Sequence, residues 1–350
     1  MTLRSEGLKA VEDHGGNLER AEALFPEAPK PWIDLSTGIN PHPYPLLALP
    51  ATTFTRLPEE KRLAELCATA ASVYGAPSST NVVAAGGTQI LLPLVTSLVA
   101  AGRAHILGPT YAEHARAAAL TGHHVEETEN FEALAGADLA MVVNPNNPDG
   151  RVISRAALLN LAGRLQAKGG LLVVDEAFMD VGRRAESLAG DVDKGNIVVL
   201  RSFGKFFGLA GVRLGLALAA PETAARLKAW LGPWAVSGPA LEYGIRALAD
   251  REWQDGMRAR LSAEAEALDR LFASHGLHAE GGTSLYRFFR CDQAQSLFRH
   301  LGESGILTRR FIDRPQDLRI GLPAGADEMK RLADAVAKWS AHRRSKESVR

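Results

Sequence analysis

Short apolar runs alternate with amphipathic segments through the middle of the chain. The runs are continuous rather than alternating, which is typical of strands buried on both faces of a parallel sheet. They predict strands at residues 81–85, 104–107, 139–143, 171–174, 197–200 and 214–218. Helical periodicity between the runs predicts helices at residues 88–101, 111–120 and 154–168. This alternation implies an α/β fold in which helices sandwich a mostly parallel sheet.

The two ends of the chain follow other patterns. Frequent prolines exclude a long helix from the first 50 residues, and the first helix is expected from Pro58 to Gly75. After Pro221 the pattern changes to one or two long helices at residues 239–275. Further expected elements are strands at 284–289, 305–308 and 318–322 and helices at 292–304 and 327–342.

These patterns predict four parts of the chain. The predicted parts are an N-terminal arm that joins the small domain (1–45), a large α/β domain (46–228), a smaller α+β domain (229–342) and a disordered tail (343–350).

Composition and charge narrow the range of possible functions. The 40 basic and 40 acidic residues give no net charge, which argues against nucleic acid as a partner. The polar N-terminus lacks the apolar core of a signal peptide, and the longest apolar run, at 90–101, is too short to span a membrane. Cys67 and Cys291 cannot form a disulfide framework. We expect a cytoplasmic protein with no membrane partner and no metal site.

Four segments that could carry chemistry follow predicted strands, where open α/β sheets bind ligands. They are residues 85–89 (AGGTQ), 144–150 (NPNNPDG), 175–178 (DEAF) and 202–215 (SFGKFFGLAGVRLG). Taken alone, the first two are better explained as turns, and the third fits a water-facing strand end equally well. The fourth places Lys205 among apolar residues, where burial would favour the neutral amine that attacks carbonyls. The commoner alternative is a surface lysine with only its stem buried.

Together, and in this order, the four segments resemble the pyridoxal-phosphate (PLP) enzymes of fold type I in the class I/II aminotransferase superfamily. The most specific part is Ser202 and Lys205 in a Ser-x-x-Lys motif, followed by Arg213. The resemblance implies the aspartate aminotransferase-like fold of PLP-dependent transferases. It implies that Lys205 is the Schiff-base lysine, that Asp175 pairs with the pyridine nitrogen and that Tyr111 stacks on the ring, which makes these three the catalytic residues.

The resemblance also implies how the rest of the cofactor is bound. The remaining residues expected to bind PLP are Gly87, Thr88, Gln89, Asn147, Ser202 and Arg213. Elementary chemistry agrees with these roles. A phosphate at the start of a helix accepts hydrogen bonds from free N–H groups and is attracted by the positive end of the helix dipole. An arginine can donate two further hydrogen bonds to it. A buried carboxylate keeps the pyridine nitrogen protonated, so that the ring withdraws electrons.

Two N-terminal motifs resemble the threonine-phosphate decarboxylases of cobalamin biosynthesis. They are the His-Gly-Gly-Asn sequence at 14–17 and the Asp-Leu-Ser-Thr-Gly-Ile-Asn-Pro sequence at 34–41. The resemblance implies decarboxylation of L-threonine O-3-phosphate to (R)-1-amino-2-propanol O-2-phosphate. The expected substrate-binding residues are His14, Gly15, Gly16, Asn17, Ser36, Thr37, Gly38, Asn147 and Arg319, the last of which would bind the α-carboxylate. Without the resemblance, residues 14–17 would be a flexible turn and Arg319 an exposed residue of an edge strand.

Two departures from the superfamily pattern accompany this hypothesis. Phe178 stands where most aminotransferases have a tyrosine that hydrogen-bonds the cofactor. Leu57 stands where an Arg-Tyr-Pro stretch supplies a tyrosine to the neighbouring subunit's cofactor phosphate. The second departure puts that contact in doubt, although the resemblance still implies a homodimer.

Two alternative functions stay open at this point. One is an aminotransferase of the histidinol-phosphate type, which also acts on a phosphorylated substrate. The other is a PLP-binding regulator. The regulator is disfavoured because only about 40 irregular residues precede the expected core and no basic stripe is visible.

Overall fold

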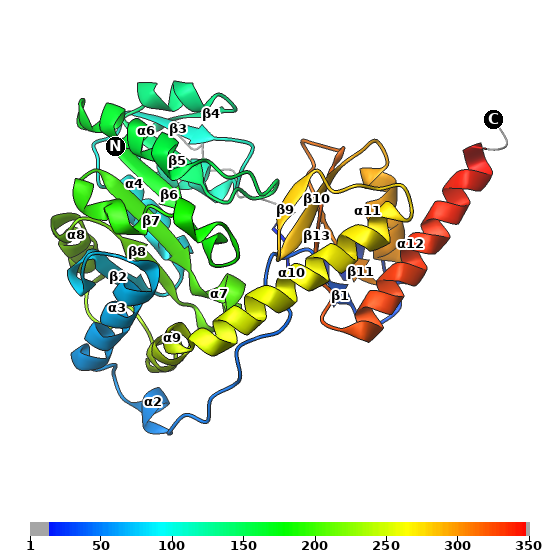
Figure 1. Cartoon of the computed structure of the whole chain (residues 1–350), viewed down its shortest axis with the longest axis horizontal. Coiled ribbons are helices and arrows are strands. Elements are labelled where there is room, and N and C mark those ends of the chain that lie inside the picture. Colours follow the sequence, from blue (N-terminus) through cyan, green and yellow to red (C-terminus); the bar gives the residue numbers. More distant parts are fainter. Residues whose placement is uncertain (1–13, 348–350) are drawn as a thin grey trace. The chain divides into compact units, whose positions relative to one another are not determined.

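A seven-stranded sheet is the centre of the first of two compact units in this computed structural model, which describes residues 14–347 (Figure 1). The strands lie in the order β2-β8-β7-β6-β5-β3-β4, and β8 alone runs antiparallel to its neighbours. Their bounds are β2 (Val82–Ala85), β3 (Arg103–Leu107), β4 (His124–Thr128), β5 (Leu139–Val143), β6 (Leu171–Asp175), β7 (Ile197–Ser202) and β8 (Gly215–Leu218). The predicted mostly parallel sheet is confirmed.

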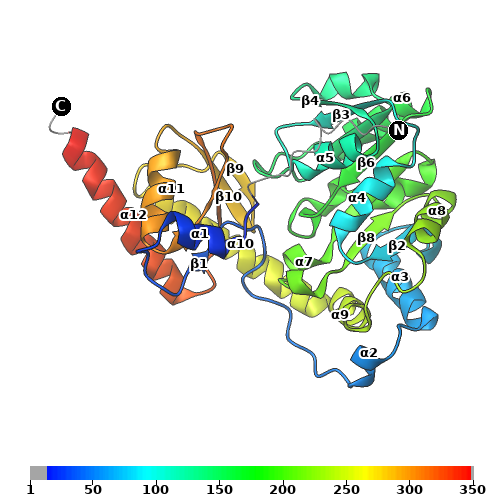
Figure 2. The same cartoon turned by 180° about the vertical axis from the view of Figure 1, so that it is seen from behind.

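Helices cover both faces of this sheet, which explains why its central strands β5 and β6 are buried along their whole length (Figures 1 and 2). One face packs against α4 (Thr88–Thr96), α5 (Glu113–Leu120) and α8 (Pro221–Leu231). On the other face lie α3 (Glu60–Tyr74) and α6 (Arg155–Gln166). The unit also contains α9 (Gly238–Ala249) and the short helices α2 (Thr52–Thr55) and α7 (Phe203–Phe206).

The second unit is built on a four-stranded antiparallel sheet in the order β12-β13-β10-β9. Its strands are β9 (Gly281–Thr283), β10 (Tyr286–Arg290), β12 (Arg309–Arg310) and β13 (Asp317–Gly321). A parallel pair, β1 (Ile33–Asp34) and β11 (Ile306–Leu307), ties the N-terminal segment to this unit. Its helices are α1 (Leu18–Leu24), α11 (Ala294–Glu303) and α12 (Ala326–Glu347), together with most of α10 (Arg251–Ala273).

The structure corrects the predicted boundary at 228/229. Among the described residues, the first unit contains 43–147 and 151–254. The second unit contains 14–42, 148–150 and 255–347. Helix α9 stays with the first unit because it packs on α3. Arg62 on α3 donates to the Glu242 carboxylate at 2.9 Å through Nε, and a Cβ at Gly244 would lie 2.7 Å from Leu66.

Three further parts of the chain differ from the predictions. Helix α12 continues to Glu347, so residues 343–347 are helical where a disordered tail was predicted. Strand β4 was missed because it lies at the sheet edge and most of its residues are polar and exposed. The predicted irregular N-terminal segment contains α1 and β1. Residues 1–13 and 348–350 of the predicted arm and tail lie outside the described residues. Within the described part, no helix is both long and apolar enough to cross a membrane.

An aromatic cluster supports α7, the helix that carries Lys205. Phe203 and Phe207 stack with their ring centroids 4.5 Å apart, and Phe206 and Phe207 contact Trp253 at 5.5 and 5.7 Å. Phe206 is fully buried. The position of α7 therefore depends on aromatic packing as well as on its neighbouring strand.

We expect Phe206→Ala to lower the free energy of unfolding by about 3–5 kcal/mol, because it leaves a cavity among rings that cannot close in. Urea denaturation followed by tryptophan fluorescence measures this, since Trp253 belongs to the cluster. The control is Leu120→Ala at the end of α5, where the side chain is 44% exposed and the expected change is within about 0.5 kcal/mol. Equal effects of the two substitutions would contradict the packing argument.

Candidate active site

The register of the parallel strands sets which residues meet at the carboxyl edge of the large sheet. Val143 of β5 is level with Asp175 of β6, and Asp175 is level with Leu200 of β7. The segments that follow these strands therefore leave the sheet side by side. The structure brings together, at one edge, the segments that begin at Asn144, Asp175 and Ser202.

A cradle for an anion lies where β2 and β8 meet the start of α4. Gly87 caps α4 with a φ of +99°, and a Cβ there would lie 2.6 Å from Nη2 of Arg213. A Cβ at Gly215 would lie 2.3 Å from the backbone nitrogen of Thr88. Ser202 pairs with Gly215 across β7 and β8. Both glycines are required by close approach, and the first turn of α4 leaves N–H groups available for an anion.

Arg213 reaches this cradle from a left-handed backbone conformation, with φ at 58°. Its Nη1 donates to the Ala210 carbonyl at 3.1 Å, and its side chain is otherwise exposed. Such a conformation is uncommon for a residue other than glycine and carries a strain of about 1 kcal/mol. The strained turn directs the guanidinium at Gly87, where a phosphate would meet it.

Asp175 is a buried carboxylate with a partner that sequence reasoning missed. Oδ1 accepts a hydrogen bond of 3.0 Å from the Ala177 amide. Oδ2 lies 3.0 Å from Nε2 of His114, which is 1% exposed. The available signal was the spacing of His114 three residues after Tyr111, which places Tyr111 just before α5 and His114 in its first turn. A single histidine in an apolar helix is more often a core residue, so this signal was weak.

The predicted stacking residue Tyr111 is held by Gln89. The Tyr111 hydroxyl donates to Oε1 of Gln89 at 3.3 Å, and the Gln89 amide donates to Glu113 at 2.7 Å. The Tyr111 ring meets the His114 ring edge-on, at 5.8 Å and 83°. Gln89 therefore contacts the aromatic residue, and this position is compatible with its predicted place near the cofactor. Asn147 is partly buried at the last position of the first unit's 43–147 segment.

Lys205 lies near the ring of Phe178. Its Nζ is 5.7 Å from the ring centroid, a distance at which a cationic amine is attracted by the aromatic face. Phe178 is buried and has no hydroxyl group, so it gives this neighbourhood no hydrogen-bond donor. The substitution noted in the sequence thus lies beside the expected reactive amine.

The residues at this edge fit PLP. The glycine cradle with Arg213 suits a phosphate, because a Cβ at either glycine would fill it. The buried Asp175 suits a protonated pyridine nitrogen, and Lys205 is a primary amine on a neighbouring segment. These groups therefore match the phosphate, the ring nitrogen and the aldehyde of the cofactor.

In the second unit, Arg319 is a buried cation on a central strand. It is 6% exposed, and β13 lies between β12 and β10, so the edge-strand alternative is wrong. Its Nη2 donates to the Ser36 carbonyl at 2.7 Å, and its guanidinium lies 5.0 Å from the ring centroid of Tyr286. Burial lowers the pKa of Arg319 to about 10, so the group stays cationic at neutral pH.

The two N-terminal motifs contact each other within the second unit. The Gly16 amide donates to the Ser36 hydroxyl at 2.7 Å, and this hydroxyl donates to Asp34 at 2.5 Å. A Cβ at Gly15 would lie 2.5 Å from the Ser36 carbonyl oxygen. The Asn17 side chain caps α1 by accepting from the Arg20 amide at 2.9 Å. The segment is therefore an ordered loop held against residues 34–36, and Asn17 has a structural role there.

A small basic cavity of about 30 Å³ next to these motifs was not predicted. It is lined by His14, Gly15, Asn17, Arg20, Ala21, Leu24, Ser36, Phe298, Leu307, Thr308, Arg309 and Arg310. Thr308 is 2% exposed, and its hydroxyl has no hydrogen-bond partner in the described part of the chain. Arginines beside a buried hydroxyl that lacks a partner suit an oxyanion. The only signal in the sequence was the Arg-Arg pair at the end of a predicted strand.

Residues 30–336 match the family described as aminotransferase class I and II. The chain belongs to this family.

Two of the relatives named threonine-phosphate decarboxylase are similar to this chain over nearly its whole length. The protein of Pseudomonas aeruginosa is 42% identical over 93% of this chain and 97% of its own length, and that of a Sinorhizobium species is 42% identical over the same shares. Among solved structures, histidinol-phosphate aminotransferase from Sinorhizobium meliloti in complex with pyridoxal-5'-phosphate has a TM-score of 0.83. It is 22% identical and covers 98% of each chain. This similarity to a solved structure bears on the fold alone, and it confirms the predicted aspartate aminotransferase-like fold.

We expect Gly215→Ala to weaken PLP binding about tenfold to a hundredfold, because its Cβ would displace the start of α4 at an overpacking cost of about 1–3 kcal/mol. Titration of the apoprotein with PLP, followed by absorbance, measures this. The matched control is Gly211→Ala in the same loop, where a Cβ meets nothing within 4 Å. Unchanged affinity in Gly215→Ala would show that the cradle does not bind the phosphate.

Proposed function

We propose that this chain is a PLP-dependent decarboxylase of L-threonine O-3-phosphate that forms (R)-1-amino-2-propanol O-2-phosphate for cobalamin biosynthesis in the cytoplasm. The observation that carries the proposal is the 42% identity, over nearly the whole length of both chains, to two proteins named threonine-phosphate decarboxylase. The ordered contact between the two N-terminal motifs and the basic cavity beside them support a phosphorylated substrate.

The cofactor would be held by residues of the first unit. Gly87, Thr88, Ser202 and Arg213 would bind its phosphate, Asp175 its ring nitrogen and Lys205 its aldehyde carbon. Tyr111 would stack on the ring, and Asn147 would hydrogen-bond the ring hydroxyl. When bound, PLP accepts the electron pair that remains on the substrate's α-carbon after a bond to that carbon breaks.

The residues of the second unit would select which bond breaks. Arg319 would bind the substrate carboxylate, while the phosphate would be bound by His14, Gly15 and Gly16 with Ser36, Thr37 and Gly38. Fixing both ends of the substrate sets the rotation about the α-carbon, and only a bond perpendicular to the ring breaks readily. The bond from the α-carbon to the carboxylate then breaks, and carbon dioxide leaves. Lys205 is suited to return a proton to the α-carbon.

The basic cavity adds candidates for the phosphate site. Arg309 and Arg310 carry permanent positive charge, and the Thr308 hydroxyl can donate to an oxyanion. Asn17 was predicted to bind the substrate, but its side-chain oxygen caps α1 and is therefore less available to the phosphate. We therefore propose that the phosphate is bound by arginine side chains as well as by the glycine amides.

The second candidate is an aminotransferase of the histidinol-phosphate type. It is supported by a relative from Citrifermentans bemidjiense named histidinol-phosphate aminotransferase, which is 33% identical over 87% of this chain, below the 42% identity of the two decarboxylases. The two candidates differ in stoichiometry, since a transaminase needs an amino acceptor and releases no carbon dioxide.

We expect the purified protein with PLP to release one carbon dioxide per threonine phosphate consumed, without any added 2-oxo acid. Mass spectrometry of the products and a carbon dioxide assay measure this. Lys205→Ala should lose at least about 99.9% of the rate, in keeping with the loss of a reactive nucleophile. A keto acid formed in proportion to added 2-oxoglutarate would instead establish the aminotransferase.

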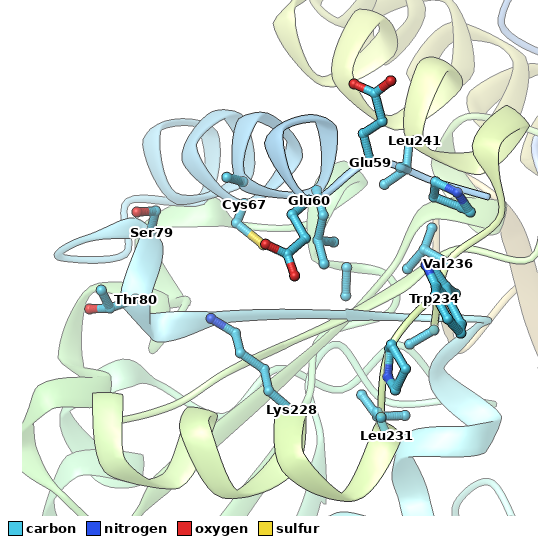
Figure 3. Close-up of a pocket in the computed structure, with 17 residues that line it drawn as sticks. Glu59, Glu60, Cys67, Ser79, Thr80, Lys228, Leu231, Trp234, Val236 and Leu241 are labelled. Carbon is cyan, nitrogen blue, oxygen red and sulfur yellow. The ribbon is translucent and has the colours of Figure 1, made fainter. Parts of the chain in front are cut away.

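We further propose that the protein is a homodimer, on the support of an apolar face of the first unit. A cavity of about 470 Å³ lies among α3, α8 and α9, and Figure 3 shows Trp234, Val236, Leu231 and Leu241 around it. Lys228 and Glu60 point into it from opposite walls (Figure 3). Pro58 also lines this cavity, and the exposed Leu57 and Phe54 precede it in the chain. A second copy would remove these side chains from water.

We expect the double substitution Phe54→Glu and Leu57→Glu to give a monomer, because two carboxylates would be buried in the interface. Sedimentation velocity measures the molecular mass in solution. The control is Ile312→Glu, which changes a comparably exposed residue of the second unit. A wild-type monomer, or a double variant that still dimerises, would contradict this assignment of the interface.

A further inference from the structure

A buried cluster of charges lies behind the candidate cofactor site, on residues adjacent in sequence to those that would hold the cofactor. We infer that Arg201, together with Glu176 and Asp180, is a positioning cluster that holds Asp175 and the Ser202–Lys205 segment in the register the cofactor needs. The inference rests on the proposed cofactor role of Asp175 and Lys205. It assigns a purpose to three charged residues that the proposed reaction does not use.

Arg201 is held on three sides. Its Nη1 donates to Glu176 at 2.8 Å, and its Nη2 donates to Asp180 at 2.7 Å. Its guanidinium lies 4.1 Å from the ring centroid of Tyr74, at the end of α3. Arg201 is only 2% exposed, and the two carboxylates are equally enclosed. Although burial opposes the charge, Asp180, Tyr74 and Glu176 together raise the pKa of Arg201, which stays a cation at all relevant pH values.

Glu176 extends the cluster into the loop after β6. Its Oε1 accepts from the Leu188 amide at 2.8 Å, and its Oε2 accepts from the Ser187 hydroxyl at 2.6 Å. Burial raises the pKa of Glu176, against the opposing effect of Arg201. The carboxylate therefore ties the end of β6 to the 187–188 segment as well as to β7.

Strand geometry converts this cluster into a constraint on the cofactor site. Asp175 is level with Leu200, so the next residues along the two strands, Glu176 and Arg201, are also level. The backbone continues this register past the end of β6, because the Glu176 amide donates to the Leu200 carbonyl at 2.8 Å. Side chains alternate along a strand, so Arg201 and Ser202 point to opposite faces. The ion pair thus lies on one face while the neighbouring residue serves the site on the other.

The cofactor site needs Asp175 and Ser202 to be placed precisely, and this explains why a cluster of buried charges would be retained. A slip of one residue between β6 and β7 would move Asp175 by about 3.3 Å relative to Ser202. A misplacement of about 1 Å in a reacting group already costs about a hundredfold in rate. Buried ion pairs contribute little net stability, because desolvation offsets their attraction, so stability alone does not account for three buried charges here. The need to fix the register between β6 and β7 accounts for them.

The test uses Arg201→Lys, which keeps the charge but cannot donate to both carboxylates in the same geometry. We expect the dissociation constant for PLP to rise about tenfold to a hundredfold. The pH dependence of the bound cofactor's visible absorption should also shift, because Asp175 and Lys205 no longer face the ring correctly. Apoprotein titration and spectra recorded across a pH series provide both readouts, and thermal unfolding of the apoprotein provides the stability.

The control is Arg155→Lys, at an arginine that also pairs with a buried carboxylate but whose own side chain is 46% exposed. Arg155 donates to Asp191 at 2.7 Å through both Nε and Nη2, and Asp191 is as buried as the carboxylates of the cluster. A loss of PLP affinity in Arg201→Lys that is absent from Arg155→Lys supports the inference. If Arg201→Lys keeps wild-type affinity and an unchanged pH profile, whatever stability it loses, the cluster is merely structural and the inference is overturned.

Glu176→Gln provides a second variant in case Arg201→Lys fails to fold. It preserves volume and removes the charge, and we again expect at least about tenfold weaker PLP binding. Wild-type affinity and spectrum in this variant would overturn the inference. A wild-type protein that binds PLP but releases no carbon dioxide would refute the proposed reaction and leave this inference standing, whereas one that binds no PLP would refute both.

Discussion

The parallel pairing of β5, β6 and β7 is the constraint on which the rest of this protein depends. Parallel strands end at the same edge of a sheet, so their hydrogen-bonded register determines which distant residues meet there. Asp175 and Ser202 lie at the same edge of the sheet because β6 and β7 are level at their carboxyl ends. Neither residue could be moved by a local change, because β6 and β7 are buried strands and a shift of either would disturb their packing.

The fold was predictable, and the residues proposed to bind the cofactor could be selected, because their signals are local. Continuous apolar runs identified the central strands, and the segments after them carried the motif residues Asp175, Ser202 and Lys205. The resemblance to a known family supplied the roles. The sequence alone left the DEAF segment undecided, and the structure shows why it matters: Asp175 and Glu176 are both buried, and each has its own partners.

The residues that were missed are those whose surroundings come from distant parts of the chain. His114 is distinguished by its distance to Asp175, and Thr308 by its place in a cavity lined by the N-terminal motif. Neither property leaves a periodic or compositional trace. The domain boundary was misplaced for the same reason, because α9 belongs with α3 through packing that no single segment reveals. Edge strand β4 and the short β1 were missed because exposed or very short strands lack a clear apolar run.

The two compact units divide the expected recognition tasks. Every proposed contact to the cofactor's phosphate, ring and aldehyde comes from the first unit, whereas Arg319 and both N-terminal motifs belong to the second. Such a division allows a lineage to change the molecule it accepts by mutating one unit, while the chemistry inherited from the other is untouched. Paralogues with new substrates would then be expected to diverge fastest in the segments around β1, β12 and β13, and a designer seeking altered selectivity should begin there.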